Sequence, residues 1–197
     1  MKYYEKNLRE NNIFELKKLI GGKVFYISFP YLNIIADEKK MSFESGTIFV
    51  NSGDISYEVT FMSKWSETLI NSIDYKEFVI DTNVSASDIV SCQMNYDKAD
   101  PNRESKVILP ASNIRSIVIY ESCIQSKNEN ISFDSHIVLI LENEIVLIFE
   151  LESDMTDFID LIITDIKNSD NVIKDYGNKN GDYSVNISQR ILLENKE

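Results

Sequence analysis

The sequence is poor in the residues from which catalytic and metal sites are built. It has one histidine, two cysteines and six glycines among 197 residues. Ser-His-Asp or Cys-His catalysis would have to use His136, which stands at the start of an apolar run where a structural role is expected. The soft ligands Cys92, Cys123 and His136 are too scattered to predict a zinc site, and no glycine-rich phosphate loop is present. We therefore predict no enzyme activity, no metal and no cofactor.

Export and membrane signals are also lacking. The first residues, Met1 to Lys6, are polar and charged instead of apolar. The chain has no run of about 18 apolar residues, which a membrane-spanning helix requires. Two cysteines without a disulfide-like spacing, in a chain without an export signal, are expected to be free thiols in a reducing compartment. These absences predict a cytoplasmic protein that does not contact membranes.

The third shortage is of positive charge in one long segment. Residues 128–166 contain no Lys or Arg but ten of the 32 acidic residues. This segment carries −10 of the formal net charge of −12, so the rest of the chain is close to neutral. Nucleic acid and anionic lipid need a basic surface, and neither is an expected ligand. Charge concentrated in this way can instead steer a basic protein partner.

What the sequence does contain is centred on two apolar runs, residues 137–141 and 145–149. Both runs are β-branched and aliphatic, without the alternation of a half-exposed strand. The three residues between them, Glu142, Asn143 and Glu144, are enough only for a tight turn, and Asn143 tolerates a left-handed backbone. We expect an antiparallel β-hairpin that is buried on both faces.

A helix is expected after this hairpin, over residues 154–166. Ser153 or Asp154 can cap it, and its apolar residues recur at helical spacing. Our functional hypothesis is that its other side, together with the end of the hairpin, forms one acidic binding surface. The residues of this predicted surface are Glu150, Glu152, Asp154, Asp157, Asp160 and Asp165. The alternative is that the helix is only a solvated lid over the sheet.

The chain as a whole predicts a single α+β domain. A helix over residues 5–20, ended by Gly21 and Gly22, is followed by strand patterns separated by turns. The expected architecture is an antiparallel sheet or open barrel with this N-terminal helix and a C-terminal capping helix. The expected divisions are an N-terminal helix (1–22), a single antiparallel α+β domain (23–168) and a C-terminal loop with a short terminal element (169–197).

Five other segments carry weaker patterns. Residues 33–40 fit a loop or a short helical turn, residues 65–75 a short helix, and residues 89–96 a strand. Residues 170–181 are polar and rich in Asn and Gly, which predicts a loop. Residues 183–193 fit a last strand or a short helix, and such a terminal element could add to a sheet in another copy.

One stretch resembles a known family. A strand, then Leu-Pro-x-Ser-x-Ile-x-Ser-Ile over residues 109–117, then two more strands and a closing helix is similar to the second half of bacterial pleckstrin-homology-like domains. The resemblance covers residues 107–167 and concerns the fold alone. It implies a bent antiparallel sheet or barrel capped by a C-terminal helix. The phosphoinositide binding of some members is not implied, because the Lys and Arg residues that it needs near the first hairpin are absent.

The preferred function is a non-enzymatic intracellular protein-binding module that acts through the acidic surface. An inhibitor or immunity-type protein, directed against a basic toxin or a nucleic-acid enzyme, would have this charge distribution. The alternative is a structural or assembly subunit that pairs through its apolar hairpin or its C-terminal segment, which leaves a homo-oligomer open. An enzyme without a recognisable motif is the third hypothesis. The expected partner is a basic protein, with no direct contact to nucleic acid or membrane.

Overall fold

The computed structural model consists largely of strands, with two helices among the residues that it describes. These residues are 2–29, 32–37, 40–65, 76–84, 105–125, 129–151, 159–179 and 184–194. In chain order the elements are β1 (Lys2–Lys6), α1 (Glu10–Lys17), β2 (Lys23–Phe29), β3 (Leu32–Asp37), β4 (Lys40–Phe43), β5 (Ser45–Ser52), β6 (Ile55–Trp65), β7 (Lys76–Val84), β8 (Ser105–Gln125), β9 (Glu129–Leu141), β10 (Ile145–Leu151), β11 (Ile159–Asp165), α2 (Ile166–Lys179) and β12 (Ser184–Glu194). The expected antiparallel, sheet-rich α+β class is confirmed, but the expected positions of the helices are wrong.

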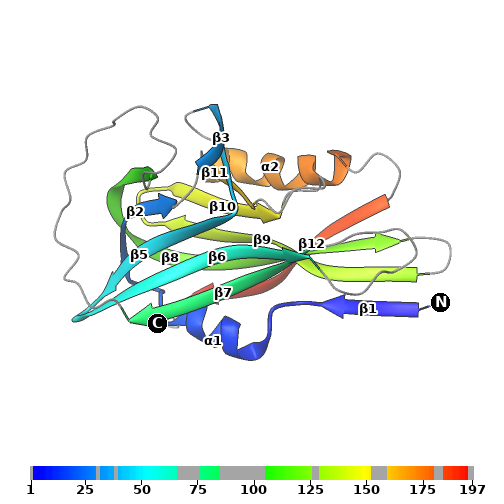
Figure 1. The fold of residues 1–197 in the computed structure, drawn as a ribbon, viewed down its shortest axis with the longest axis horizontal. Helices are drawn as coiled ribbons and strands as arrows, with labels where there is room; N and C mark the ends of the chain where they lie inside the picture. Colours follow the sequence, from blue (N-terminus) through cyan, green and yellow to red (C-terminus); the bar gives the residue numbers. More distant parts are fainter. Residues whose placement is uncertain are drawn as a thin grey trace.

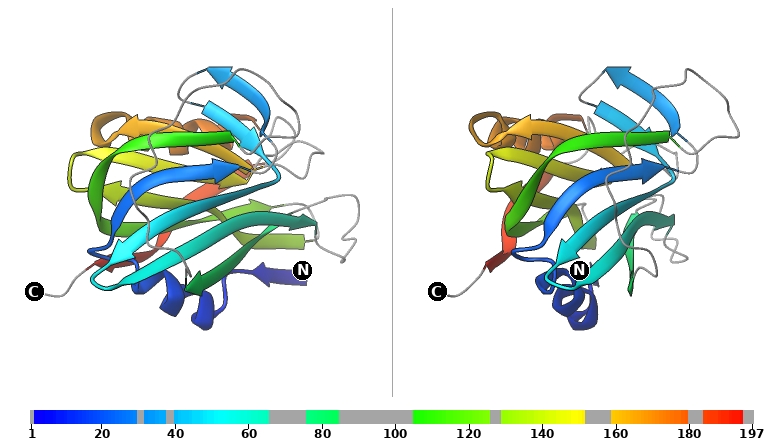
Figure 2. Two further views of the ribbon diagram at one scale, coloured as in Figure 1. Left: turned by 60° about the vertical axis from the view of Figure 1, so that its left-hand side comes forward. Right: turned by 90° about the vertical axis from the view of Figure 1, so that its left-hand side faces the viewer.

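The described strands form one hydrogen-bonded network. Its order is β3-β4-β11-β10-β9-β8-β2-β5-β6-β7, with β1 beside β9 and β12 beside β8. Strand β8 is long enough to serve two sheets: residues 105–113 pair with β2, whereas residues 114–125 pair with β9. We call the part from β3 to β8, with β1 and β12, sheet A, and the part from β8 to β7 sheet B. Figure 2 shows β8 bending from one sheet into the other.

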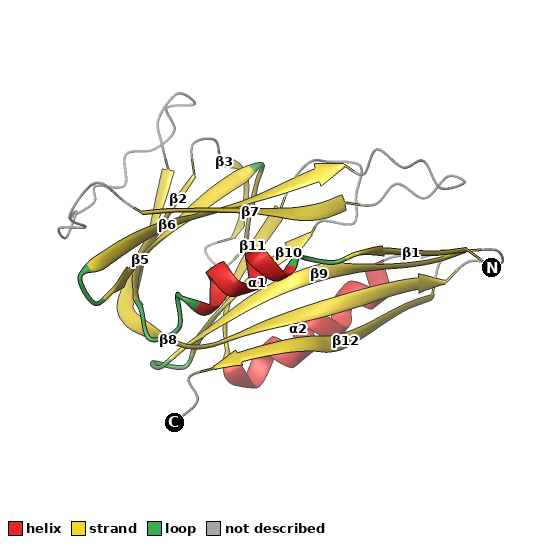
Figure 3. Cartoon of the chain, turned by 90° about the horizontal axis from the view of Figure 1, so that it is seen from below, coloured by secondary structure: helices red, strands yellow, loops and turns green. Residues whose placement is uncertain are grey.

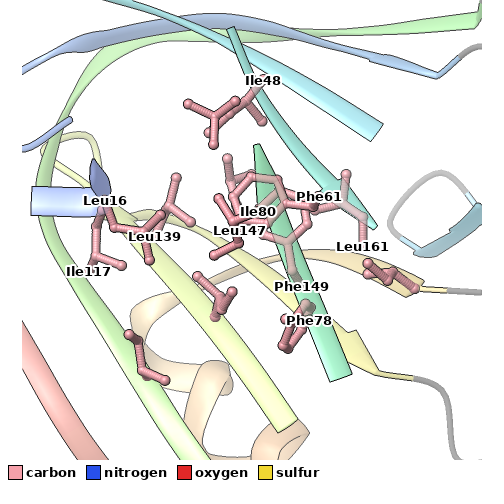
Figure 4. Packing of buried hydrophobic residues seen from close by; sticks show 14 of the residues in the cluster. Leu16, Ile48, Phe61, Phe78, Ile80, Ile117, Leu139, Leu147, Phe149 and Leu161 are labelled. Carbon is pink, nitrogen blue, oxygen red and sulfur yellow. The ribbon is translucent and has the colours of Figure 1, made fainter. Parts of the chain in front are cut away.

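The main hydrophobic core lies between the two sheets. Phe61 of β6 stacks on Phe149 of β10 with ring centroids 4.1 Å apart, and Leu16 of α1 is fully buried in the same cluster. Figure 4 shows side chains from both sheets and from α1 meeting in this core: Leu16, Ile48, Phe61, Phe78, Ile80, Ile117, Leu139, Leu147, Phe149 and Leu161. Because both sheets and α1 contribute, none of the three layers buries its apolar face alone.

The predicted hairpin of two apolar runs is confirmed. Strands β9 and β10 pair antiparallel with Leu139 opposite Leu147, and both side chains are fully buried in the main core. Val138 and Ile148 are buried in a second cluster on the other face. The positive φ of the turn, 67°, belongs to Glu144 and not to Asn143. Since both faces are covered within the chain, the hairpin offers no apolar face to another subunit.

The N-terminal helix is shorter than the predicted range of 5–20. Helix α1 begins at Glu10, and the residues before it form β1, which pairs in parallel with residues 129–133 of β9. Strand β10 pairs only with residues 136–140 of β9, so the remaining edge of β9 needs another hydrogen-bonding partner. Lys2–Lys6, with two adjacent tyrosines, has the strand propensity to supply it. This tertiary demand overrides the local helical pattern.

The C-terminal helix begins at Ile166 and not at residue 154. Residues 159–165 form β11, which lies between β10 and β4. Their Ile-rich spacing fits a buried strand as well as a helix, and the neighbouring strands decide between the two. Helix α2 then covers most of the expected loop of residues 170–181, and it holds Ile173 and Tyr176 buried against the sheet.

Helix α2 is a crossover connection on the outer face of sheet A. Strands β11, β10, β9, β8 and β12 alternate in direction, so β11 and β12 run parallel. The helix that joins them packs against β10, β11 and β12. Figures 1 and 3 show α2 and α1 on opposite sides of the molecule. Sheet A is therefore covered on both faces, which explains why the runs of the hairpin do not alternate.

Several smaller expectations can also be compared with the structure. The predicted loop or turn at residues 33–40 is wrong, because residues 32–37 form β3 beside β4. The last element, β12, is a strand, one of the two forms expected. The helix expected at residues 65–75, apart from Trp65 in β6, and the strand at 89–96 lie outside the described residues.

The cysteine and membrane expectations are tested only in part. Cys123 is a free thiol, and Cys92 lies outside the described residues. Among the helices that the structure describes, none is long and apolar enough to cross a membrane.

Candidate functional site

The structure does not bring the six residues of the predicted acidic surface together on the outside. Glu150 and Asp160 are each only 1% exposed. Asp165 is exposed, whereas Glu152, Asp154 and Asp157 lie outside the described residues. The surface prediction is thus wrong for Glu150 and Asp160. The reason is that β11 replaces the expected helix and places Asp160 directly opposite Glu150 in the sheet.

These two buried acids belong to a row of polar residues that crosses five strands of sheet A. Neighbours along the row lie directly opposite each other in antiparallel register, and such residues point to the same face. That face is the one covered by α2. We call this set the polar row, and its members, in order across the sheet, are Tyr120, His136, Glu150, Asp160 and Ser42.

The centre of the polar row is the contact between His136 and Glu150. The Nε2 atom of His136 lies 3.4 Å from Oε2 of Glu150, and neither side chain is exposed by more than 1%. Tyr176 of α2 lies over the imidazole, with ring centroids 4.7 Å apart and the rings nearly perpendicular. Burial, and then the charges of Glu150 and Asp160, raise the pKa of the Tyr176 hydroxyl well above its ordinary value. The Tyr176 hydroxyl is therefore kept in its neutral form.

The far end of the polar row reaches the surface through a lysine. Asp160 accepts a hydrogen bond from the Ser42 hydroxyl, and its other oxygen lies 2.8 Å from Nζ of Lys40. The side chain of Lys40 is 34% exposed, against 2% for Asp160. A buried carboxylate needs such a cation and hydrogen bonds to offset its desolvation. The row is thus a covered structure with one cationic end at the solvent.

A β-bulge at Ser135 determines which side chains enter the polar row. Tyr120 is opposite His136, and the next residue, Glu121, is opposite Asp134, so Ser135 has no partner in the register. The Ser135 hydroxyl accepts a hydrogen bond from Ser122 at 2.7 Å and lies 2.8 Å from Nδ1 of His136. In a regular strand, two residues that are two positions apart point to the same face of the sheet. A bulged residue between them makes them point to opposite faces. Asp134 and His136 consequently belong to two different polar clusters.

Asp134 holds both ends of the chain. Its carboxylate accepts hydrogen bonds from the Leu8 amide at 2.6 Å and from Nε of Arg190 at 2.7 Å, and Nη2 of Arg190 donates a further bond. Burial raises the pKa of the Asp134 carboxyl, and the bonds from Arg190 and Leu8 pull that pKa down without cancelling the rise. We call Asp134, Arg190 and the Leu8 amide the terminal clamp, since they tie the segment after β1 and strand β12 to β9.

Two members of the polar row, His136 and Glu150, together with the neighbouring Ser135, are arranged in the sequence of a catalytic triad but are not accessible. Ser135, His136 and Glu150 are linked as a hydroxyl, an imidazole and a carboxylate, which is the pattern of nucleophilic catalysis. Ser135 and His136 are both 0% exposed, so no substrate can reach them in this conformation. Within the described ranges, no group of three His, Cys, Asp or Glu residues could hold a metal ion. In this conformation, these side chains can hold charges and protons inside the sheet.

Of the acidic residues in the segment 128–166, those that the structure describes as exposed lie at one end of sheet A. Glu142 and Glu144 are exposed in the β9–β10 turn. Asp165, also exposed, is opposite Ile145, the residue that follows Glu144. Glu142 is held by the Asn113 amide at 3.0 Å, and Asp165 caps α2 by accepting the Asn168 N–H at 3.0 Å. We call Glu142, Glu144 and Asp165 the acidic end.

Sequence reasoning missed the polar row, although one signal was present. His136 and Glu150 are equally distant from Asn143, the middle of the predicted turn, so the hairpin itself pairs them. The positions of Asp160 and Ser42 carried no such signal, since their strands are joined to the hairpin only through the register of β11 and β4.

Comparison with family models, with curated proteins and with solved structures returned no match. The resemblance of residues 107–167 to pleckstrin-homology-like domains therefore stays a prediction about the fold.

Proposed function

We propose that this chain is a non-enzymatic protein-binding module that docks a basic partner on its acidic end. The supporting observation is that Glu142, Glu144 and Asp165 are all exposed at the same end of sheet A, in the β9–β10 turn and at the end of the adjacent strand β11. In this proposal the docking surface is smaller than the one predicted from the sequence. It keeps Asp165, adds the two turn residues and excludes the buried Glu150 and Asp160.

The acidic end is held in place before any partner binds. Asn113 orients Glu142, and Asp165 is fixed as the cap of α2. Side chains that are already ordered lose less conformational entropy on binding, which favours their use in recognition. Three like charges at one end of the sheet also repel each other, and a basic partner would relieve that repulsion.

The buried acids, in contrast, are neutralised inside the chain. Asp160 has Lys40 and Asp134 has Arg190 as cationic neighbours. They contribute little to the field outside, so the exposed acids dominate what a diffusing partner meets. An inhibitor or immunity-type protein that blocks a basic toxin or nucleic-acid enzyme is one functional class with this signature, and an acidic scaffold protein is another. An enzyme is disfavoured because the only histidine is 0% exposed.

The test is comparative capture of partners from a cell lysate. The variant Glu142→Gln/Glu144→Gln/Asp165→Asn removes three charges and keeps an oxygen at the α2 cap, since Asn is also a good capping residue. A basic protein retained by the wild type should be lost from this variant, and its retention should fall steeply as salt rises. Quantitative mass spectrometry of the retained proteins measures both effects.

The matched control removes three exposed charges elsewhere: Glu10→Gln/Glu44→Gln/Asp54→Asn. It has the same net charge as the test variant, so it separates a local surface from overall acidity. If both variants retain the same partner equally well, the acidic end is not the docking surface. If the retained partner is itself acidic or its retention does not respond to salt, the proposal fails altogether.

A further inference from the structure

The outer edge of β12 is a second surface with interaction chemistry. Strand β12 pairs with β8 along residues 184–194, and no other described strand pairs with it. Its other edge therefore presents backbone N–H and C=O groups without a strand partner among the described residues. Natural proteins usually protect such edges with lysine, proline, a very short strand or a covering segment.

β12 has few of these protections, and the other long edge strand shows the contrast. Residues 184–194 contain no Lys or Pro, and the strand has 11 residues with one register shift, between Gln189 and Ile191. At the end of sheet B, the Asn12 amide donates a hydrogen bond to the backbone carbonyl of Ile80 in β7, and Lys6 pairs with Glu77. The edge of β7 is thus contacted by the N-terminal segment of the chain, whereas no described strand pairs with the outer edge of β12.

Charge indicates what kind of strand the edge of β12 can accept. Between residues 184 and 193 the only charged side chain is Arg190, and it is bound to Asp134 of its own chain. A charged segment would find no counter-charge on this edge, so an uncharged strand fits it best. The same stretch of β12 in a second copy is such a strand.

The neighbouring helix permits the same arrangement. A two-fold axis that pairs two antiparallel β12 strands keeps both copies of α2 on the same face of the joined sheet. Among residues 166–176 of α2, where the structure describes the side chains, the exposed charges are two bases and two acids: Lys167, Lys174, Asp170 and Asp175. This side is thus a locally balanced part of a chain whose net charge is −12. Two copies that meet here therefore bring little net charge together at the joint.

We propose that two copies of this chain form a two-fold dimer by antiparallel pairing of their β12 strands into one continuous sheet. The pairing is carried by residues 184–189, which precede the register shift. An interface of one strand per copy belongs to the small, transient class, with a dissociation constant on the order of micromolar. The dimer is independent of the acidic end, which lies on the β9–β10 turn and at the end of β11.

Sedimentation velocity over a range of protein concentrations tests the dimer. The wild type should shift from monomer to dimer as concentration rises, and added salt should strengthen the dimer because it screens the repulsion between two acidic chains. This salt response is opposite to the one expected for a basic partner on the acidic end. The edge variant Asn186→Lys/Ser188→Lys should raise the dissociation constant at least about tenfold, because it places like charges along the joint.

The control variant Asn11→Lys/Ala111→Lys adds the same two charges at exposed positions away from β12 and should leave the dimer unchanged or slightly stronger. Hydrogen exchange of the wild type gives a readout that needs no variant: residues 184–189 should exchange more slowly as concentration rises, and β6 should not. A wild type that is monomeric at every concentration overturns the proposal. Equal dimerisation of both variants, or unchanged exchange in residues 184–189, overturns it as well.

Discussion

The terminal clamp and the polar row both bury carboxylates, but different kinds of group compensate them. Asp134 is bound by a guanidinium, which is always charged and donates two hydrogen bonds to the same carboxylate. Glu150 lies against an imidazole, and Asp160 against a half-exposed lysine and a serine hydroxyl. The clamp therefore depends on one permanent charge, whereas the row takes its compensation from several groups on two strands, β9 and β4.

The difference matches what each cluster joins. The terminal clamp connects the segment at Leu8, strand β9 and strand β12, which are far apart in sequence. The polar row lies between strands that are already paired and is closed by Tyr176 of α2. The permanent charge of Arg190 attaches segments near the two ends of the chain to β9. The polar row instead packs beneath α2, on strands that are already paired with each other.

The largest effect is expected from Arg190→Met. It removes the cation of the clamp and leaves Asp134 buried, which should lower the free energy of unfolding by about 3–5 kcal/mol at neutral pH. Burial already raises the pKa of Asp134, and loss of Arg190 raises that pKa further. When folding raises the pKa of a carboxyl group, its contribution to the free energy of unfolding is present while the group is protonated. That contribution is lost as pH rises through the pKa of the folded state. The cost of Arg190→Met should therefore shrink at acid pH, as urea unfolding at several pH values will show.

The control for this variant is Leu147→Ala in the main core. It should cost about 2–5 kcal/mol because it leaves a cavity in a fully buried site. No titrating group is removed, so the difference from the wild type should not depend on pH in the acid range. A cost of Arg190→Met that is equally independent of pH would show that Asp134 is not the source of the loss.

An intermediate effect is expected from His136→Phe in the polar row. Phenylalanine keeps an aromatic ring beneath Tyr176 but removes both ring nitrogens, which face Ser135 and Glu150. Loss of these polar contacts in a buried site should cost about 1–3 kcal/mol. The comparison of the two clusters requires this cost to be smaller than that of Arg190→Met, measured by the same urea titration at neutral pH. The reverse order would place the main charge compensation in the row.

The smallest effect at neutral pH is expected from Tyr176→Phe, about 1 kcal/mol for a buried hydroxyl. At alkaline pH the sign should reverse in favour of the variant. Because the folded pKa of Tyr176 is raised above its ordinary value of 10.0, its stabilisation is complete below that pH and is lost as pH rises toward the folded value. Wild-type stability should then fall more steeply than that of Tyr176→Phe between about pH 9 and about pH 11. Equal slopes would contradict a buried, neutral Tyr176.

The parts of the fold that could be predicted from the sequence are those with strong local patterns. The hairpin of β9 and β10 has two unbroken apolar runs and a short turn, so its pairing and its burial on both faces follow from local residues. The β11 segment has apolar residues whose spacing fits two periods, and only its place between β10 and β4 selects the strand. Helix α2 has few apolar residues in a polar segment, and its helical face becomes clear only against sheet A.

The site was less predictable than the fold for a related reason. The sequence alone does not distinguish a solvated Asp or Glu from a buried one. Whether the carboxylate is buried depends on the strand that pairs with its own strand. Because charge predicts exposure on average, the sequence places Glu150 and Asp160 at the surface. Their actual neighbours, His136 and Ser42, come from other strands, and the bulge at Ser135 that aims His136 has no signature of its own in the sequence.

The pairing of β4 with β11 has a consequence for the order of events during synthesis. Ser42 and Asp160 are 118 residues apart in the chain. At a synthesis rate of about 5–20 residues per second, β11, the second neighbour of β4, is therefore made roughly 6–24 s after β4. During that time the edge of β4 is open to other nascent chains. A lysine at the open edge of a strand discourages such pairing. Lys40 therefore first disfavours the pairing of β4 with strands of other chains. It becomes the counter-ion of Asp160 only after β11 has been synthesised and has paired with β4.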